Sequence, residues 1–259
     1  MPGFSTHDGT TLRTEVNTVT NRSGAPNQIR IKALVKFLLL NALLVMIGGA
    51  LFLPRAVREM QFNDSANLQQ LSMALTTYHQ LHGRLPSAVI YNDQGEPLYS
   101  WRVALLPFLE EQPLYNAFHR DEPWDSPSNL RLLSQMPAVY GLRPRISGDF
   151  RAGYTLCKVF TGKDTPFEGK QGLSFKNDFV SCSQTFLVVK AGAPVPWTKP
   201  EDIEYDPLGP LPDLNTPEDN FFRVSMGGGS TRVFLKGTSE RTLRALISRT
   251  DKHDLGKGW

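Results

Sequence analysis

The sequence predicts an α+β protein with an N-terminal transmembrane helix ahead of a larger outer domain. Three observations lead to this fold class: a long charge-free run near the N-terminus, helix-like segments after it, and strand-like runs towards the C-terminus. Helices and strands are segregated along the chain rather than alternating, so we expect an antiparallel sheet. At 259 residues, the chain is long enough to bury a substantial core.

The membrane helix is predicted over residues 31–53. Phe37 to Leu53 is a run of 17 residues without a charge, and Lys32 and Lys36 before it can extend their ammonium groups to the lipid surface. The alternative is a buried core helix, but charge-free runs of this length are unusual in soluble cores. The run follows the polar residues 1–30, so an uncleaved anchor is favoured over a cleaved signal peptide.

Charged residues predict the orientation of this span and exclude nucleic-acid binding by the domain that follows it. Residues 1–53 hold five Lys or Arg and two Asp or Glu, a net charge of +3, and the positive-inside bias puts the N-terminus in the cytoplasm. Residues 1–30 are then expected to be a disordered cytoplasmic tail. Residues 54–259 become an extracytoplasmic domain with 23 charges of each sign, which lacks the basic surface needed to bind nucleic acid.

Helices are expected to come first in the outer domain. Leu68, Leu71, Leu75 and Tyr78 recur at helical spacing, with Asp64 or Ser65 as the cap and Gly83 as the stop. This helix either continues the membrane helix through a kink at Pro54 or is separate from it. Two further helices are predicted, over Trp101–Glu111 and from the Asp125-Ser126-Pro127 start to Gln135.

Strand-like runs follow these helices, over Tyr154–Phe160, Asp178–Lys190 and Phe221–Met226. A fourth run, Thr231–Lys236, is joined to the third by three consecutive glycines, which favours a hairpin. The proline-rich residues 194–217 predict an ordered but irregular loop. A last amphipathic helix is expected over Glu240–Arg249.

Several stretches of the outer domain resemble a known family. They are Asn67-Leu68-Gln69-Gln70-Leu71, His82-Gly83-Arg84-Leu85-Pro86, Ser100-Trp101-Arg102-Val103, Asp121-Glu122-Pro123-Trp124-Asp125-Ser126-Pro127 and Val195-Pro196-Trp197-Thr198-Lys199-Pro200-Glu201-Asp202. Together they look like the pilin-like outer domain abundant in planctomycete-type bacteria, a domain of unknown function that also carries a solute-binding label. The resemblance covers roughly residues 65–250 and implies a long N-terminal helix packed on a small antiparallel sheet.

Two differences from this family bear on processing and binding. The family's prepilin peptidase site would precede the span, whereas Gly3-Phe4-Ser5 lies far from it. Gly228-Gly229-Ser230 stands where many members carry Asp-Gly before the last strand. The resemblance therefore does not by itself imply peptidase processing of this chain or binding through that Asp-Gly.

Two cysteines, Cys157 and Cys182, fall in strand-like runs. Outside the cytoplasm they are able to form a disulfide that closes a loop of about 26 residues, worth roughly 3 kcal/mol on the loop-entropy model. The alternative is two unpaired, buried thiols, because the sequence does not show whether their strands are neighbours.

The other polar clusters are expected to be structural. His79 and His82 share a helix face at a spacing that suits a metal, but no Glu or Cys accompanies them, so a surface pair or helix cap is favoured. An acidic group lacks the alternating ligands and central glycine of an EF-hand, which favours a solvated loop; it consists of Glu110, Glu111, Asp121, Glu122 and Asp125. No metal or cofactor is expected.

Aromatic residues supply the one candidate binding surface. A ligand or partner surface is predicted around Trp101, Arg102, Trp124, Asp125 and Trp197. The alternative is that the tryptophans are buried anchors of a small sheet, because aromatic rings dominate core burial.

The sequence does not predict an enzyme, because it contains no G-x-S-x-G, H-E-x-x-H or phosphate-binding loop. We expect a single-pass protein of the cytoplasmic membrane that acts through contacts with other pilin-like subunits or envelope proteins, as a pseudopilin-like component of an envelope assembly. The alternative is a membrane-tethered module that binds a sugar or another solute.

Overall fold

The computed structural model describes residues 64–141, 153–214 and 221–250. The chain divides into two compact units, Met1–Ala56 and Val57–Trp259, and all described residues belong to the second. The predicted tail over residues 1–30 and the predicted transmembrane helix over residues 31–53 lie outside the described residues. Within the described part, no helix is both long enough and apolar enough to cross a membrane.

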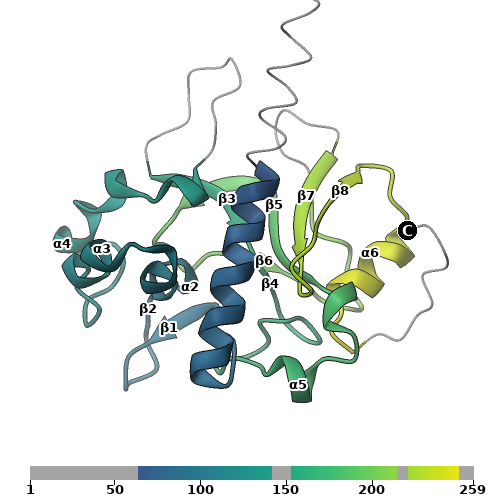
Figure 1. Cartoon of the computed structure of the whole chain (residues 1–259), viewed down its shortest axis with the longest axis horizontal. Coiled ribbons are helices and arrows are strands. Elements are labelled where there is room, and N and C mark those ends of the chain that lie inside the picture. Colours follow the sequence, from purple (N-terminus) through teal and green to yellow (C-terminus); the bar gives the residue numbers. More distant parts are fainter. Residues whose placement is uncertain (1–63, 142–152, 215–220, 251–259) are drawn as a thin grey trace, which may run out of the picture. The chain divides into compact units, whose positions relative to one another are not determined.

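The described chain opens with a helix over residues 64–82, which we call the long helix (dark blue in Figure 1). Leu68, Leu71 and Leu75 are fully buried, at the three- and four-residue spacing that puts them on one face. The helix ends at Gly83, whose φ of +75° is the left-handed conformation that favours glycine, and whose N–H donates to the His79 carbonyl. The predicted period and stop are therefore confirmed.

A four-stranded antiparallel sheet is the centre of the domain, with the strand order β3-β5-β7-β8. Its strands are β3 (Tyr154–Lys158), β5 (Phe186–Pro196), β7 (Phe221–Met226) and β8 (Thr231–Leu235). The predicted hairpin is confirmed, since β7 and β8 pair directly and the Met226 N–H donates to the Ser230 carbonyl across the glycine turn. The α+β class with antiparallel sheets is confirmed with it.

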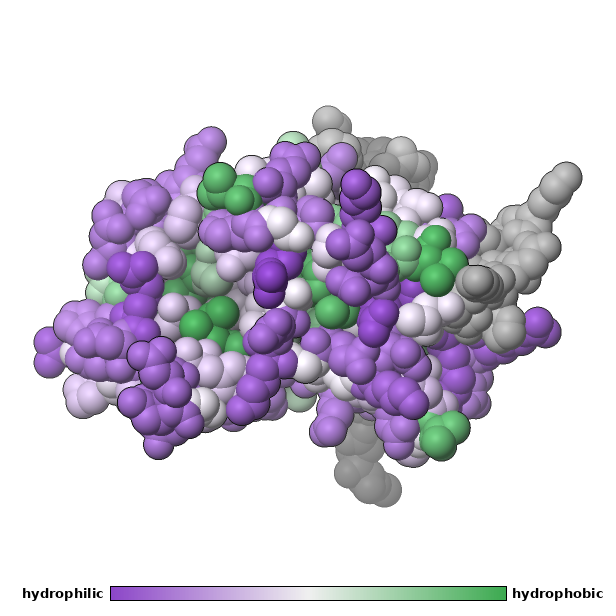
Figure 2. Space-filling model, turned by 90° about the horizontal axis from the view of Figure 1, so that it is seen from below, coloured by the Kyte–Doolittle hydropathy of each residue, from purple (hydrophilic) through white to green (hydrophobic). Residues whose placement is uncertain are grey.

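Each face of this sheet carries its own core. Val188 and Val189 are consecutive in β5, and therefore point to opposite faces. Val188 belongs to the core that contains the buried leucines of the long helix, which crosses in front of β5 in Figure 1. Val189 belongs to the core that contains Leu246 of α6 (Glu240–Ile247), so the sheet is covered by a helix on both sides. Figure 2 shows a largely hydrophilic outer face on which apolar residues form separate spots.

An ion-pair cluster fixes the start of the described helix to the sheet. The Asp64 carboxylate accepts from Lys190 Nζ of β5 at 2.6 Å and from Arg223 Nη1 of β7 at 3.3 Å. Asp64 therefore bridges two neighbouring strands, rather than only capping the helix as the sequence suggested. Further along, Ser72 Oγ donates to the Met226 carbonyl at 3.3 Å.

Short elements surround this frame. They are β1 (Val89–Tyr91), β2 (Pro97–Ser100), α2 (Trp101–Ala104), η1 (Leu106–Leu109), α3 (Gln112–Ala117), α4 (Pro127–Leu130), η2 (Leu133–Gln135), η3 (Ala138–Tyr140), β4 (Phe160–Thr161), α5 (Phe175–Asp178), η4 (Cys182–Gln184) and β6 (Ile203–Glu204). β1 and β2 form an antiparallel pair, and β4 and β6 a parallel one.

Several predicted elements differ from the structure. The helix expected from the Asp125-Ser126-Pro127 start to Gln135 ends at Leu130 as α4, and Leu133–Gln135 form the separate turn η2. The strand expected over Tyr154–Phe160 is divided at Val159 into β3 and β4. The helix expected over Trp101–Glu111 divides into α2 and η1, because Pro107 has no N–H to donate. The strand expected from Asp178 begins at Phe186, because the polar residues before it form η4 and Thr185 Oγ1 donates back to the Ser181 carbonyl. Residues 194–217 were expected to be irregular, but β5 continues to Pro196 and β6 follows.

Candidate functional site

A buried ion pair between Arg102 and Asp202 lies at the centre of the candidate site. Arg102 Nη2 and Asp202 Oδ1 are 2.7 Å apart, and the two side chains are 0% and 2% exposed. Arg102 is the second residue of α2, which begins after its N-cap Ser100, and Asp202 directly precedes β6. The pair therefore joins two of the sequence stretches that carry the family resemblance, 100 residues apart.

The Arg102 guanidinium is fully occupied by hydrogen bonds. Nε donates to the Cys157 carbonyl at 2.7 Å, and Nη1 to Ser100 Oγ at 2.6 Å. The longer bonds run to the carbonyls of Lys199, at 3.3 Å, and Glu201, at 3.4 Å. Together with Asp202, these acceptors account for all five N–H groups of the side chain. Arg102 consequently ties α2, β3 and the segment before β6 into one unit.

The two oxygens of Asp202 differ in their surroundings. Oδ1 accepts from Arg102, from Trp101 Nε1 at 3.2 Å and from the Val159 N–H at 3.0 Å. Oδ2 is buried and has no hydrogen-bond partner among the described residues. Burial raises the pKa of the Asp202 carboxyl, and Arg102 beside it opposes that rise. The pair therefore leaves one buried acceptor unused.

Asp202 also lines a small cavity, which we call the Asp202 pocket. Its volume is about 210 Å³. The other lining residues come from four separate segments of the chain, and are Ala88, Val89, Tyr91, Thr161, Gly162, Phe167, Gly169 and Pro200. Gly162, with a φ of +107°, is required where its backbone approaches Tyr205, the residue after β6, since a Cβ there would lie 2.2 Å from the Tyr205 carbonyl oxygen.

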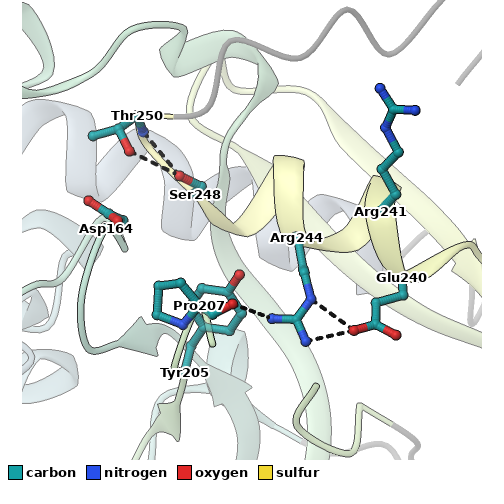
Figure 3. A pocket seen from close by; sticks show the side chains of 8 residues that line it. All are labelled: Asp164, Tyr205, Pro207, Glu240, Arg241, Arg244, Ser248 and Thr250. Atoms are coloured by element: carbon teal, nitrogen blue, oxygen red, sulfur yellow. Dashed lines mark hydrogen bonds and ion pairs between the residues drawn. The ribbon is translucent and has the colours of Figure 1, made fainter. Parts of the chain in front are cut away.

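A larger and more open pocket of about 680 Å³ lies beside α6; we call it the α6 pocket (Figure 3). Its charged lining residues are two acids, Asp164 and Glu240, and two bases, Arg241 and Arg244. Arg244 is already used, because it pairs with Glu240 at 2.6 Å and donates to the carbonyls of Pro207 and Gly209. Arg241 extends away from this pair and forms no hydrogen bond or ion pair with any described residue.

A family model described as "Protein of unknown function (DUF1559)" matches residues 55–185, which is 131 of the 259 residues. The protein belongs to the DUF1559 family. The short name of that family, SBP_bac_10, carries a solute-binding label, which agrees with the resemblance seen in the sequence. No curated protein and no solved structure matches the chain.

The predicted ligand surface is divided in this DUF1559 protein. Trp101, Arg102 and Trp197 are each 0% exposed, so they do not contribute to a surface. Trp197 Nε1 donates to the Leu133 carbonyl at 3.2 Å, and its ring stacks on Tyr140 with centroids 6.1 Å apart. The buried-anchor alternative describes these two tryptophans, because their rings fill the core between η3, α2 and β3.

Trp124 and Asp125 lie at the surface. Trp124 is half-buried, with Lys199 Nζ 5.8 Å from its ring centroid, and Asp125 is exposed. The helix cap falls to Ser126, whose Oγ accepts from the Asn129 N–H at 3.2 Å. The buried Asn129 side chain in turn holds the preceding loop, donating to the Pro123 carbonyl at 3.0 Å. Local hydrogen bonds of Ser126 and Asn129 therefore hold the Asp121–Pro127 stretch in its conformation.

Both cysteines are free thiols in the structure, so the disulfide considered from the sequence is not formed. Cys157 is buried in β3, whereas Cys182 is half-buried in η4, which replaces the strand expected there. Burial raises the pKa of the Cys157 thiol, and raises the pKa of Cys182 to about 11. Neither thiol is activated for nucleophilic chemistry.

The two helix histidines have separate roles. His79 Nε2 accepts from the Phe175 N–H at 3.1 Å and thereby holds α5 to the long helix. His82 Nδ1 lies 2.9 Å from the Tyr78 carbonyl, and the two rings stack with centroids 4.1 Å apart. Of the described residues, no group of three or more His, Cys, Asp and Glu side chains is arranged to hold a metal ion.

Sequence reasoning missed the Asp202 pocket. Asp202 and Trp101 both lie in stretches that carry the family resemblance, but nothing in the sequence indicates that their side chains are in contact. The remaining wall comes from β1, β4 and the loop over residues 162–169, which hold no motif. Asp202 follows Lys199-Pro200-Glu201 in a stretch of mixed polarity, and nothing in that pattern distinguishes it as a buried acid.

Proposed function

We propose that this DUF1559 protein is a membrane-anchored, extracytoplasmic, pilin-like interaction protein rather than an enzyme. The observation that carries the proposal is the long helix, packed on an antiparallel sheet and preceded in the sequence by the apolar residues 31–53. In this proposal the long helix is the part of the domain that follows the anchor in the sequence.

The contacts of Asp64 support this role. They tie the end of the long helix that is nearest in sequence to the predicted span, linking it to β5 and β7. Both cations are largely buried, with side chains 10% and 7% exposed, so the attachment is shielded from solvent and salt. Asp64 therefore fixes the first described turn of the long helix to the sheet.

The exposed face of the long helix is available for contacts. Met73 is 63% exposed and Leu81 is 73% exposed, although the other face of the same helix is buried. We propose single-pass insertion in the cytoplasmic membrane, with other pilin-like subunits or envelope proteins as partners. Association would then run along the apolar face of residues 34–53 and the helix that follows.

Cross-linking of the full-length protein in cells tests this role. Residues 34–53 are replaced by an unrelated spanning segment of equal length, which preserves anchoring but changes the helix face. We expect oligomers for the natural span and their loss in the replacement, with equal amounts of both chains in the membrane fraction. Equal oligomers from both chains, or none from the natural span, would contradict the proposal.

A second candidate function is a membrane-tethered solute-binding module. Two pockets favour it, the α6 pocket of about 680 Å³ and the smaller Asp202 pocket of about 210 Å³, together with the family's label. The larger volume lies within the range typical of small-molecule sites. Solute binding that survives replacement of the span would favour this candidate over the interaction role.

A further inference from the structure

The α6 pocket is lined by one acid and one base that form no ion pair. Glu240 and Arg244 neutralise each other at 2.6 Å, and Arg244 is held further by the Pro207 carbonyl at 3.0 Å, so this pair is a fixed part of the wall. The other two charged lining residues are Asp164 and Arg241. Neither of their side chains forms a hydrogen bond or an ion pair with any described residue.

Asp164 is fixed through its backbone, whereas its carboxylate makes no bond to the described chain. Its φ is +63°, in the left-handed region that aspartate and asparagine adopt more readily than most side chains. The Asp164 N–H donates to Glu168 Oε2 at 3.1 Å, and the Asp164 carbonyl accepts from the Arg249 N–H at 2.8 Å. Arg249 itself pairs with Glu168 at 2.6 Å, so this neighbouring base does not neutralise the Asp164 carboxylate.

The unpaired acid and the unpaired base lie towards opposite ends of α6 (Figure 3). Arg241 is in the first turn of the helix, whereas Ser248 is its C-cap. Asp164 belongs to the C-cap end, because its carbonyl binds the N–H of Arg249, the residue after the cap. The hydroxyls of Ser248 and Thr250, 3.2 Å apart, line the same end. Positions 241 and 248 are separated by roughly 10 Å along the helix axis.

This arrangement suits a ligand that carries both charges. An amine alone would leave Arg241 unpaired, and a carboxylic acid alone would leave Asp164 unpaired. A molecule with an ammonium group at one end and a carboxylate at the other satisfies both through charge-assisted hydrogen bonds. Arg241 is exposed and extends away from the wall pair in Figure 3, so its guanidinium can turn onto a bound carboxylate.

The length of the pocket restricts the ligand further. An extended chain advances about 3.3–3.6 Å per residue, so the two termini of a tripeptide are roughly 10 Å apart. The pocket volume of about 680 Å³ is within the range of small-molecule sites. The Tyr205 ring and Pro207, which also line the pocket, offer apolar surface to the body of such a ligand.

We propose that the α6 pocket binds a short peptide with free termini, about three residues long, whose ammonium group pairs with Asp164 and whose carboxylate pairs with Arg241. Recognition through the two termini selects peptides by length and by unblocked ends. The inference is independent of the proposed interaction role, and it assigns a ligand class and a site to the solute-binding candidate.

Ligand-observed NMR on the full-length protein in detergent micelles tests this proposal, with trialanine as the probe. N-acetyl-trialanine lacks the ammonium group, and trialanine amide lacks the carboxylate, while both keep the rest of the molecule. We expect saturable binding of trialanine and roughly tenfold weaker binding of each blocked form, because each loses one charge-assisted hydrogen bond.

Two variants assign the termini to their residues. Asp164→Asn removes the charge but tolerates the positive φ, and should bind trialanine and its N-acetyl form equally. Arg241→Gln should bind trialanine and its amide equally. The matched controls, Asp93→Asn and Lys236→Gln, change exposed charges that line neither described pocket, and should behave like wild type. Circular dichroism establishes that each variant folds.

Equal binding of trialanine and both blocked forms by wild type overturns the ligand class. Discrimination between free and blocked termini that survives in both Asp164→Asn and Arg241→Gln overturns the site. No saturable binding of trialanine overturns the proposal as a whole. The span-dependent oligomers of the proposed interaction role are expected to persist in both variants, so failure of one proposal is distinguishable from failure of the other.

Discussion

Removing the Arg102 guanidinium is expected to cost more stability than any surface change in the unit Val57–Trp259. Arg102→Met leaves the side chain's volume but removes five hydrogen bonds and the charge opposite Asp202. Breaking one partner of a buried ion pair typically costs 3–5 kcal/mol, because the other charge stays buried without compensation. Asp202 fits that case, since its side chain is 2% exposed and Oδ2 already lacks a partner.

The expected loss in the free energy of unfolding is therefore about 3–5 kcal/mol. For a unit of this size each kcal/mol corresponds to a shift of roughly 2–4 °C, so the melting temperature should fall by roughly 6–20 °C. Tryptophan fluorescence during urea unfolding reports the change, because Trp101 and Trp197 are fully buried in the native state.

Arg120→Met is the matched control. Arg120 is exposed, donates to Tyr115 Oη at 2.9 Å and lies over the Tyr115 ring, so its loss should stay within about 0.5 kcal/mol. The double variant Arg102→Met/Asp202→Leu should be destabilised less than the sum of its two single variants, since it removes both charges. If Arg102→Met costs no more than Arg120→Met, the account of the buried pair is refuted.

Three further predictions concern the long helix and the cysteines. Leu75→Ala should lower the free energy of unfolding by about 2–5 kcal/mol in urea titrations, because Leu75 is fully buried. Leu81→Ala, at a side chain that is 73% exposed, should change it by less than about 0.5 kcal/mol. Similar losses in the two variants would contradict the assignment of the buried and exposed helix faces. Burial lowers the pKa of His79 below its usual 6.5, so the unfolded state binds the proton more readily, and stability should fall as the pH drops from neutral through about 6.5 towards the folded pKa. In His79→Gln, the curve of melting temperature against pH should be flatter over this range. An unchanged slope would contradict the role given to His79. Iodoacetamide should leave Cys157 unmodified in the native protein and modify it after unfolding, because the thiol is buried and the pKa is raised; rapid native modification, seen by mass spectrometry, would contradict this.

Local sequence patterns correctly predicted the elements whose formation depends on residues close together in the sequence. The leucine period of the long helix corresponds to a face that is buried in the structure, and the glycines at residues 227–229 join β7 to β8. These features depend on neighbours within a few positions, which the sequence displays directly. Ser126 and Pro127 likewise begin α4, because the cap and the first-turn proline act locally.

Features that depend on distant segments were not predictable in the same way. The strand predicted from Asp178 is wrong over residues 178–185, where tertiary contacts and side-chain hydrogen bonds favour α5 and η4. Arg102 and Asp202 were both noted, yet their pairing across 100 residues has no signature in either stretch. The burial of Trp101 and Trp197 likewise depends on distant segments. The sequence alone therefore did not decide whether they form a ligand surface or anchor the core.

The central claim is that the outer domain is carried outside the cytoplasmic membrane on an uncleaved N-terminal anchor. Protease protection on intact cells and spheroplasts, combined with N-terminal sequencing of the membrane-bound protein, tests it most directly. The account predicts that residues 54–259 are cleaved by protease added from outside, and that the mature chain keeps Met1 or Pro2. A mature chain that begins near residue 37, or an outer domain protected in spheroplasts, would contradict it.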